Sequence, residues 1–131
     1  MPVQMTSYLK KVLIADAVIS GAAALMMAAG SSLLSGLLGL PSELLLWAGI
    51  ALVPFVAALG FMIRADRPPA GVIVAIITIN IAWVIVSLIV AFGPAFAPTL
   101  LGKIFVVAQA ATVGLFAELQ IIGLRRAGAT A

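Results

Sequence analysis

The feature that most constrains this chain is a long uncharged run, "GVIVAIITINIAWVIVSLIVAF", from Gly71 to Phe92. The hydrocarbon core of a bilayer is about 30 Å thick, and a helix needs about 20 mostly apolar residues to cross it. Three other segments also meet this requirement, so the expected spans are about 8–29, 43–63, 71–92 and 99–124. Strands of a membrane barrel would alternate over about 10 residues, and no such pattern is present. The sequence therefore predicts an all-α bundle of four transmembrane helices in one domain, residues 1–131.

The composition excludes a soluble domain and most enzyme chemistry. Hydrophobic residues make up 65% of the chain and charged residues 8%, too few for a polar shell. The chain has no cysteine and no histidine, which removes disulfides, thiolate catalysis and the commonest general base and metal ligand. It also has no glycine-rich phosphate loop and no nucleophile elbow. We therefore expect a non-enzymatic protein with no catalytic residue, no metal site and no cofactor.

The basic residues predict the orientation of the bundle. All but one of the 7 lysines and arginines flank the same side of the expected spans. They are Lys10, Lys11, Arg64, Arg67, Arg125 and Arg126. Because positive charge marks the cytoplasmic side of a membrane, we expect a multi-pass protein with both termini in the cytoplasm. The net charge of +3 does not indicate nucleic-acid binding, because these residues lie at the ends of apolar segments.

The two connections on the other side are apolar and end alike. Pro41-Ser42 closes the first connection and Pro98-Thr99 closes the second, and Ser42 and Thr99 are both suitable N-caps. This likeness suggests two similar helical hairpins related by an axis along the membrane normal. The first connection, "GSSLLSGLLGLPSE", is interpreted either as a short helix in the interface or as a loop against the bundle.

Two ionisable residues lie inside the expected spans. Asp16 is about 7 to 8 Å from Lys11 along a helix, and Glu118 is about 10 to 11 Å from Arg125. Both carboxyl groups are therefore expected at a similar depth in the cytoplasmic half, within reach of Arg64 and Arg125. One hypothesis is a structural cluster of these four residues, and the other is a carboxylate pair that relays a proton.

The fourth span carries small or polar residues on two opposite faces. Ala110, Gly114 and Glu118 share one face, and Gln109 and Gln120 share the other. Asn80 and Gln109 are the other strongly polar residues expected near mid-membrane. Since a glutamine facing lipid is costly, one face is expected to meet the bundle and the other a partner, such as a second copy of the chain.

Small residues also mark a packing surface in the first span. Ala17, Gly21, Ala24 and Ala28 form a stripe that lets another helix approach closely. In the second span, Pro54 removes a backbone hydrogen bond, so a kink is expected there.

The stretches "KKVLIADAVISGAAALMMA", "LLGLPSELLLWAGIALVPFVA" and "FAELQIIGLRR" together resemble small four-span inner-membrane proteins of proteobacteria. The resemblance covers nearly the whole chain and implies a bacterial inner membrane. It transfers no activity and no functional residue.

Three functions stay open at this point. The first is a self-associating module or accessory subunit of a membrane complex, with a homo-oligomer or another membrane protein as partner. The second is a small proton-coupled transporter or channel that uses Asp16 and Glu118. The third is a protein that binds or modifies lipid of the bilayer through its two apolar connections, beside Trp47 or Phe96.

Overall fold

The computed structural model describes the backbone of residues 3–130 and the side chains of residues 3–128. It is all-α in this range, as the sequence predicts. The helices are α1 (Ser7–Ala29), α2 (Ser31–Leu38), α3 (Ser42–Arg64), α4 (Ala70–Phe92) and α5 (Leu100–Thr130). Four of them, all except α2, are long and apolar enough to cross a membrane, which confirms a multi-pass architecture.

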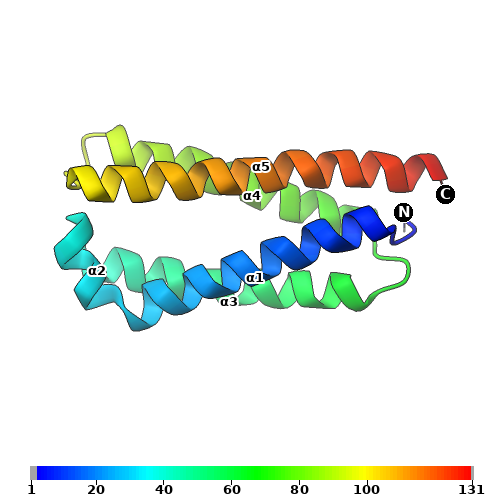
Figure 1. Cartoon of the computed structure of the whole chain (residues 1–131), viewed down its shortest axis with the longest axis horizontal. Coiled ribbons are helices and arrows are strands. Elements are labelled where there is room, and N and C mark those ends of the chain that lie inside the picture. Colours follow the sequence, from blue (N-terminus) through cyan, green and yellow to red (C-terminus); the bar gives the residue numbers. More distant parts are fainter. Residues whose placement is uncertain (1–2, 131) are drawn as a thin grey trace.

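The long helices form two antiparallel pairs that lie beside each other (Figure 1). We call α1 with α3 the first hairpin and α4 with α5 the second hairpin. The hairpins meet mainly where α1 packs on α5, whereas α3 and α4 barely touch. The start of α1, the end of α5 and the α3–α4 connection lie at one end of the bundle, which we call the terminal end; α2 lies at the other (Figure 1).

The first hairpin is packed through small residues. A β-carbon added to Gly49 of α3 would lie 2.7 Å from the backbone nitrogen of Ala28 and 2.9 Å from the carbonyl oxygen of Ala24. Gly21 lies farther along the same surface, where an added β-carbon would be 3.9 Å from Val56. The small residues of α1 thus let the backbone of α3 approach closely.

Backbone hydrogen bonds tie the two hairpins together at both ends. At the α2 end, the amide of Thr99 donates to the carbonyl of Leu38 at 3.0 Å, and its hydroxyl donates to the carbonyl of Leu37 at 2.9 Å. At the terminal end, the amides of Val3 and Met5 donate to the carbonyls of Pro68 and Asp66, each at 3.0 Å. The seam between the hairpins is therefore closed at its ends by the connections.

The apolar first connection is helical, as in one interpretation, and packs against the bundle, as in the other. It forms the helix α2, and this helix packs against α3 and α5. Leu38 and Leu40 are buried, while Leu33 and Leu37 are exposed. The helix ends at Gly39, whose φ of 68° is the left-handed conformation that glycine adopts without strain.

The expected likeness between the two connections extends only partly to their caps. The hydroxyl of Thr99 accepts a 3.0 Å hydrogen bond from the amide of Gly102 and so caps α5. Ser42 is already the first residue of α3, and Pro41 occupies the cap position without a side-chain bond, so Ser42 is not the expected N-cap. Pro54 lies inside α3, which continues through it.

Candidate functional site

A buried polar network joins three of the four long helices. It consists of Asp16 and Ser20 from α1, Asn80 from α4 and Gln120 from α5, and all four residues are buried. The Asp16 carboxylate accepts hydrogen bonds from the Ser20 hydroxyl at 2.7 Å, the Asn80 amide at 3.1 Å and the Gln120 amide at 2.6 Å. We call these four residues the polar network.

Both amides of the polar network turn their nitrogens toward Asp16. The nitrogen is the donor of an asparagine or glutamine side chain, so the Asp16 oxygens accept from both residues. The Asn80 nitrogen donates a second bond, at 2.9 Å, to the amide oxygen of Gln120. Asp16 thus fixes how the two neighbouring amides are turned.

Asp16 is fully buried without a cationic partner. All 7 lysines and arginines of the chain are exposed. Its carboxyl group accepts hydrogen bonds from three neutral donors instead, and leaving a buried polar group unpaired costs about 1–3 kcal/mol. The network therefore links α1, α4 and α5 through a group that is costly to leave unpaired.

Apolar side chains fill the bundle between the network and the terminal end. Leu9 and Leu13 lie one to two turns from Asp16 on α1, and Ile73 and Ile76 precede Asn80 on α4. Together with Leu59 of α3 they are essentially inaccessible to solvent. This packing closes the terminal side of the network.

A second polar group lies nearer the α2 end. Gln109 of α5 accepts a 2.8 Å hydrogen bond from the indole nitrogen of Trp83. Its own amide nitrogen donates to the Ser87 hydroxyl at 2.8 Å and to the carbonyl of Val106 at 3.1 Å. Gln109 is therefore satisfied inside the chain and does not require a partner protein.

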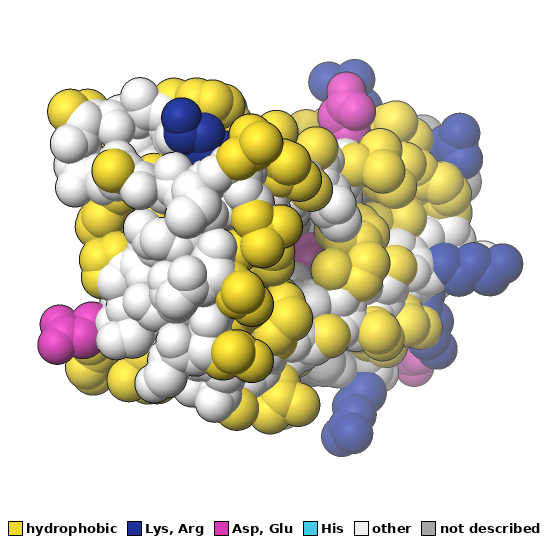
Figure 2. All heavy atoms as spheres, turned by 60° about the vertical axis from the view of Figure 1, so that its left-hand side comes forward, with side chains coloured by type: hydrophobic (Ala, Val, Ile, Leu, Met, Phe, Trp, Pro, Cys, Tyr) yellow, Lys and Arg dark blue, Asp and Glu magenta, His cyan; other side chains and the backbone are white. Residues whose placement is uncertain are grey.

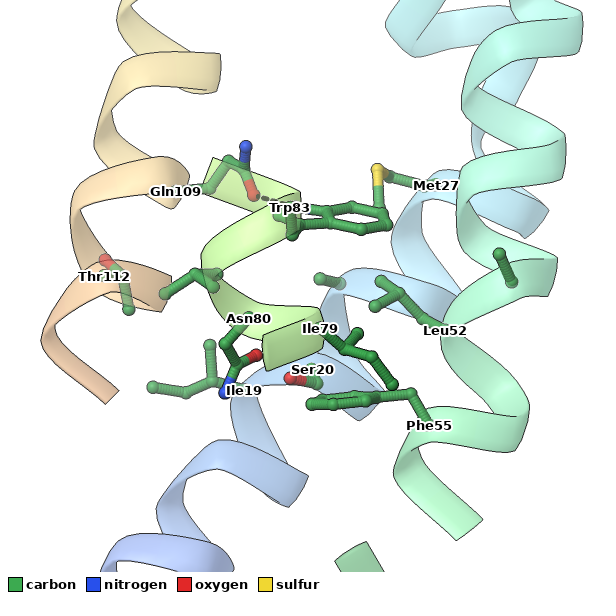
Figure 3. A pocket seen from close by; sticks show the side chains of 13 residues that line it. Ile19, Ser20, Met27, Leu52, Phe55, Ile79, Asn80, Trp83, Gln109 and Thr112 are labelled. Atoms are coloured by element: carbon green, nitrogen blue, oxygen red, sulfur yellow. Dashed lines mark hydrogen bonds between the residues drawn. The ribbon is translucent and has the colours of Figure 1, made fainter. Parts of the chain in front are cut away.

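The space between the hairpins contains a cavity of about 260 Å³, which lies on the α2 side of the polar network. Side chains from all four long helices line it, and most of them are apolar (Figure 3). Its polar lining residues are Ser20, Asn80, Trp83, Gln109 and Thr112. Figure 2 shows a hollow flanked by hydrophobic side chains, with an acidic group visible at its floor.

A second cavity of about 140 Å³ continues toward the α2 end. The two cavities share Met27, Trp83 and Gln109 in their walls. The second is lined there by Leu40, Leu44 and other apolar residues. We call the two cavities together the cleft; it runs from the α2 end to the polar network.

The structure does not bring together the four residues expected to form an ionic cluster. Asp16 is buried in the polar network, whereas Glu118, Arg64 and Arg125 are exposed. The structure also shows which of the two polar faces of α5 meets the bundle. Gln109 and Gln120 do share a face, but that face points into the bundle and Glu118 points away from it. A proton relay that pairs Asp16 with Glu118 is therefore not supported.

The small residues expected at helix contacts lie at several interfaces. Ala24 faces α3, Ala110 is buried, and an added β-carbon at Gly114 would lie 3.7 Å from Val84 of α4. Ala17 and Ala28 are partly buried in the first hairpin. The sequence analysis did not identify Gly123 as a packing residue. An added β-carbon there would lie 3.1 Å from Leu9 of α1. Its position one turn beyond Gln120, on the same face of α5, could have indicated this contact.

A scan against protein-family models finds no match for the chain, and searches of curated proteins and of solved structures also find none.

Proposed function

We propose that this chain is a non-enzymatic, multi-pass protein of a bacterial inner membrane that binds a lipid-like ligand in the cleft. The observation that carries the proposal is the 260 Å³ cavity between the hairpins, at the middle of four membrane-length helices. The basic residues at the terminal end support an orientation with both termini in the cytoplasm. The resemblance to four-span proteobacterial proteins supports the same membrane.

The walls of the cleft support a ligand that arrives from the bilayer. Ligand sites are mostly apolar concavities with a few polar groups that fix orientation, and this composition matches the cleft. Ile19 and Ile79 contribute to the wall and are also exposed on the outer surface, at 46% and 50%. A molecule dissolved in the membrane thus meets the cavity wall without first crossing water.

Mass spectrometry of the protein purified from native membranes in a mild detergent tests this function. Ala51 of α3 lines the cavity, and Ala51→Phe is expected to fill part of it and remove a co-purifying apolar molecule. Ala57 is an exposed alanine of the same helix outside the cavity, so Ala57→Phe is the matched control. Retention of the same molecule by both variants, or recovery of none from the unmodified protein, would contradict the proposal.

A second function, self-association or service as an accessory subunit, is supported by the exposure of Glu118. This carboxylate lies on the outer surface of α5, about 10 Å along the helix from Arg125. An acid at this position is costly when it faces lipid and favourable when a partner supplies a donor. The surface is on the opposite side of α5 from Gln109, so this function does not compete with ligand binding in the cleft.

Cross-linking in native membranes tests this second function. Glu118→Leu is expected to abolish cross-linked species, while Glu43→Leu, which changes an exposed acid at the α2 end, is expected to preserve them. Identical cross-linking in both variants would remove the support that Glu118 gives.

A further inference from the structure

The floor of the cleft has an unused hydrogen-bond acceptor. Both bonds of the Asn80 nitrogen are inside the polar network, to Asp16 and to Gln120. The Asn80 oxygen receives no hydrogen bond from any donor in the described residues 3–128. No fully buried side-chain oxygen or nitrogen in the described residues lacks a partner, so this unpaired oxygen belongs to the 3% of Asn80 that is accessible, and it faces the cavity that Asn80 lines (Figure 3).

Ser20 adds a second acceptor at the same place. Its hydroxyl proton is used in the 2.7 Å bond to Asp16, which leaves oxygen lone pairs free. Figure 3 shows the oxygens of Ser20 and Asn80 turned toward the same part of the cavity, and both residues line it.

The donors of the other polar residues that line the larger cavity are already committed. The Thr112 hydroxyl donates to the carbonyl of Ala108 at 2.9 Å, and the indole nitrogen of Trp83 donates to Gln109. Gln109 itself donates to Ser87 and Val106. The larger cavity therefore presents acceptors to a ligand and has no spare donor among these side chains.

The carboxyl group behind the floor also favours a donor. Asp16 bonds directly to both Ser20 and Asn80, and no lysine or arginine lines either cavity. Carboxyl oxygens carry partial negative charge, which attracts a cation where the dielectric constant is low. Acceptors in front of a carboxylate thus favour a group that both donates hydrogen bonds and carries positive charge.

We propose that the cleft binds an amphiphile with a primary ammonium head, which donates to Asn80 Oδ1 and Ser20 Oγ while its apolar chain lies along the cleft toward the α2 end. This inference rests on the proposed ligand-binding function and specifies the ligand's chemistry. It assigns Asp16 the role of a positioning residue, because its carboxyl group holds Ser20 and Asn80 by hydrogen bonds and is itself inaccessible to solvent.

Three amphiphiles with the same chain test the proposal: dodecylammonium, dodecyltrimethylammonium and dodecanoate. Each is titrated into the full-length protein in phosphatidylcholine nanodiscs, with concentrations expressed per mole of bilayer lipid. Trp83 lines the cleft and reports binding by its fluorescence once the exposed Trp47 is replaced by phenylalanine. We expect saturable binding of dodecylammonium at least about tenfold tighter than that of the other two, because a hydrogen bond to a charged group contributes at least about one factor of ten.

The outcomes separate the two proposals. Saturable binding of all three with equal affinity overturns the ammonium inference and leaves the ligand-binding function standing. Equal binding of dodecyltrimethylammonium also overturns it, because that head cannot donate a hydrogen bond. Absence of saturable binding by any of the three contradicts ligand binding in the cleft itself.

Two hydroxyl deletions provide a matched pair of variants. Ser20→Ala removes an acceptor at the floor, and we expect dodecylammonium affinity to fall about tenfold. Thr112→Val removes a lining hydroxyl that is bonded to its own helix, and we expect no change. Equal effects of the two variants on affinity would overturn the assignment of Ser20 as an acceptor for the ammonium head. The comparison of head groups on the protein with native Ser20 stays decisive if Ser20→Ala does not fold.

Discussion

Gln120 donates a 2.6 Å hydrogen bond to Asp16 across 104 positions of the chain. The bond joins the last transmembrane helix to the first, and neither side chain is accessible to solvent. The contact between α1 and α5 therefore includes a polar bond inside an otherwise apolar interface. The stability of the fold and the acceptor groups at the floor of the cleft therefore depend on the same polar network.

Gln120→Leu is expected to destabilise the protein by about 2–3 kcal/mol, because it removes a donor from a buried carboxylate. Denaturation in mixed micelles, followed by circular dichroism, measures the change. Glu118→Leu, two residues away on the exposed side of α5, is expected to leave stability unchanged or raised. Equal losses in the two variants would contradict the burial of Gln120.

Gly49→Ala is expected to cost about 1–3 kcal/mol, since the new β-carbon would collide with the backbone of α1 at Ala24 and Ala28. Gly60 lies in the same helix with nothing within 4 Å of an added β-carbon. Gly60→Ala is therefore expected to be neutral or stabilising through helix propensity. The same denaturation assay compares them, and a tolerated Gly49→Ala would show that α1 and α3 are not in close backbone contact.

Thr99→Val is expected to loosen the α2 end, because one hydroxyl both caps α5 and bonds the carbonyl of Leu37. The expected cost is about 1 kcal/mol, with faster amide hydrogen exchange confined to α2 and the start of α5. Thr78→Val removes a hydroxyl that bonds only its own helix, at Val74, and serves as the control. Unchanged exchange at α2 in Thr99→Val would argue against this tie.

Single-cysteine variants are expected to report the orientation, because the natural chain has no cysteine to add background. Asp66→Cys lies in the α3–α4 connection and Glu43→Cys at the α2 end. In intact cells, a membrane-impermeant maleimide is expected to label Glu43→Cys and not Asp66→Cys. The reverse labelling would place both termini outside the cytoplasm.

The spans were predictable from sequence because a bilayer imposes a length and an apolar composition on every crossing helix. The structure has helices at all four expected positions, and α5 extends beyond the expected end of its span. The sequence does not decide the structure of the apolar segment before Pro41, because "SSLLSGLL" is short enough to be either a helix or a loop. Its helical form depends on contacts with α3 and α5, which are absent from the local sequence.

The hydrogen-bond partners of the buried polar side chains were less predictable from the sequence. Helical phase correctly groups Gln109 with Gln120, but phase alone does not tell which face of α5 meets the bundle. The ionic cluster is predicted from formal charges. In the structure, Asp16 is hydrogen-bonded by two neutral amides and a hydroxyl instead. Those contacts depend on how the second hairpin docks on the first, which no spacing within one helix encodes.

The distribution of the polar network over the chain has a consequence for biosynthesis. Chains are made from the N-terminus, so α1 enters the membrane before the helices that carry Asn80 and Gln120 have been synthesised. Until then, Ser20 is the one network partner that Asp16 has on its own helix. The first hairpin is thus made with an incompletely paired acid, and only translation of α5 completes its partners. We expect nascent chains that end before Gln120 to be recognised by membrane chaperones or proteases as unfinished.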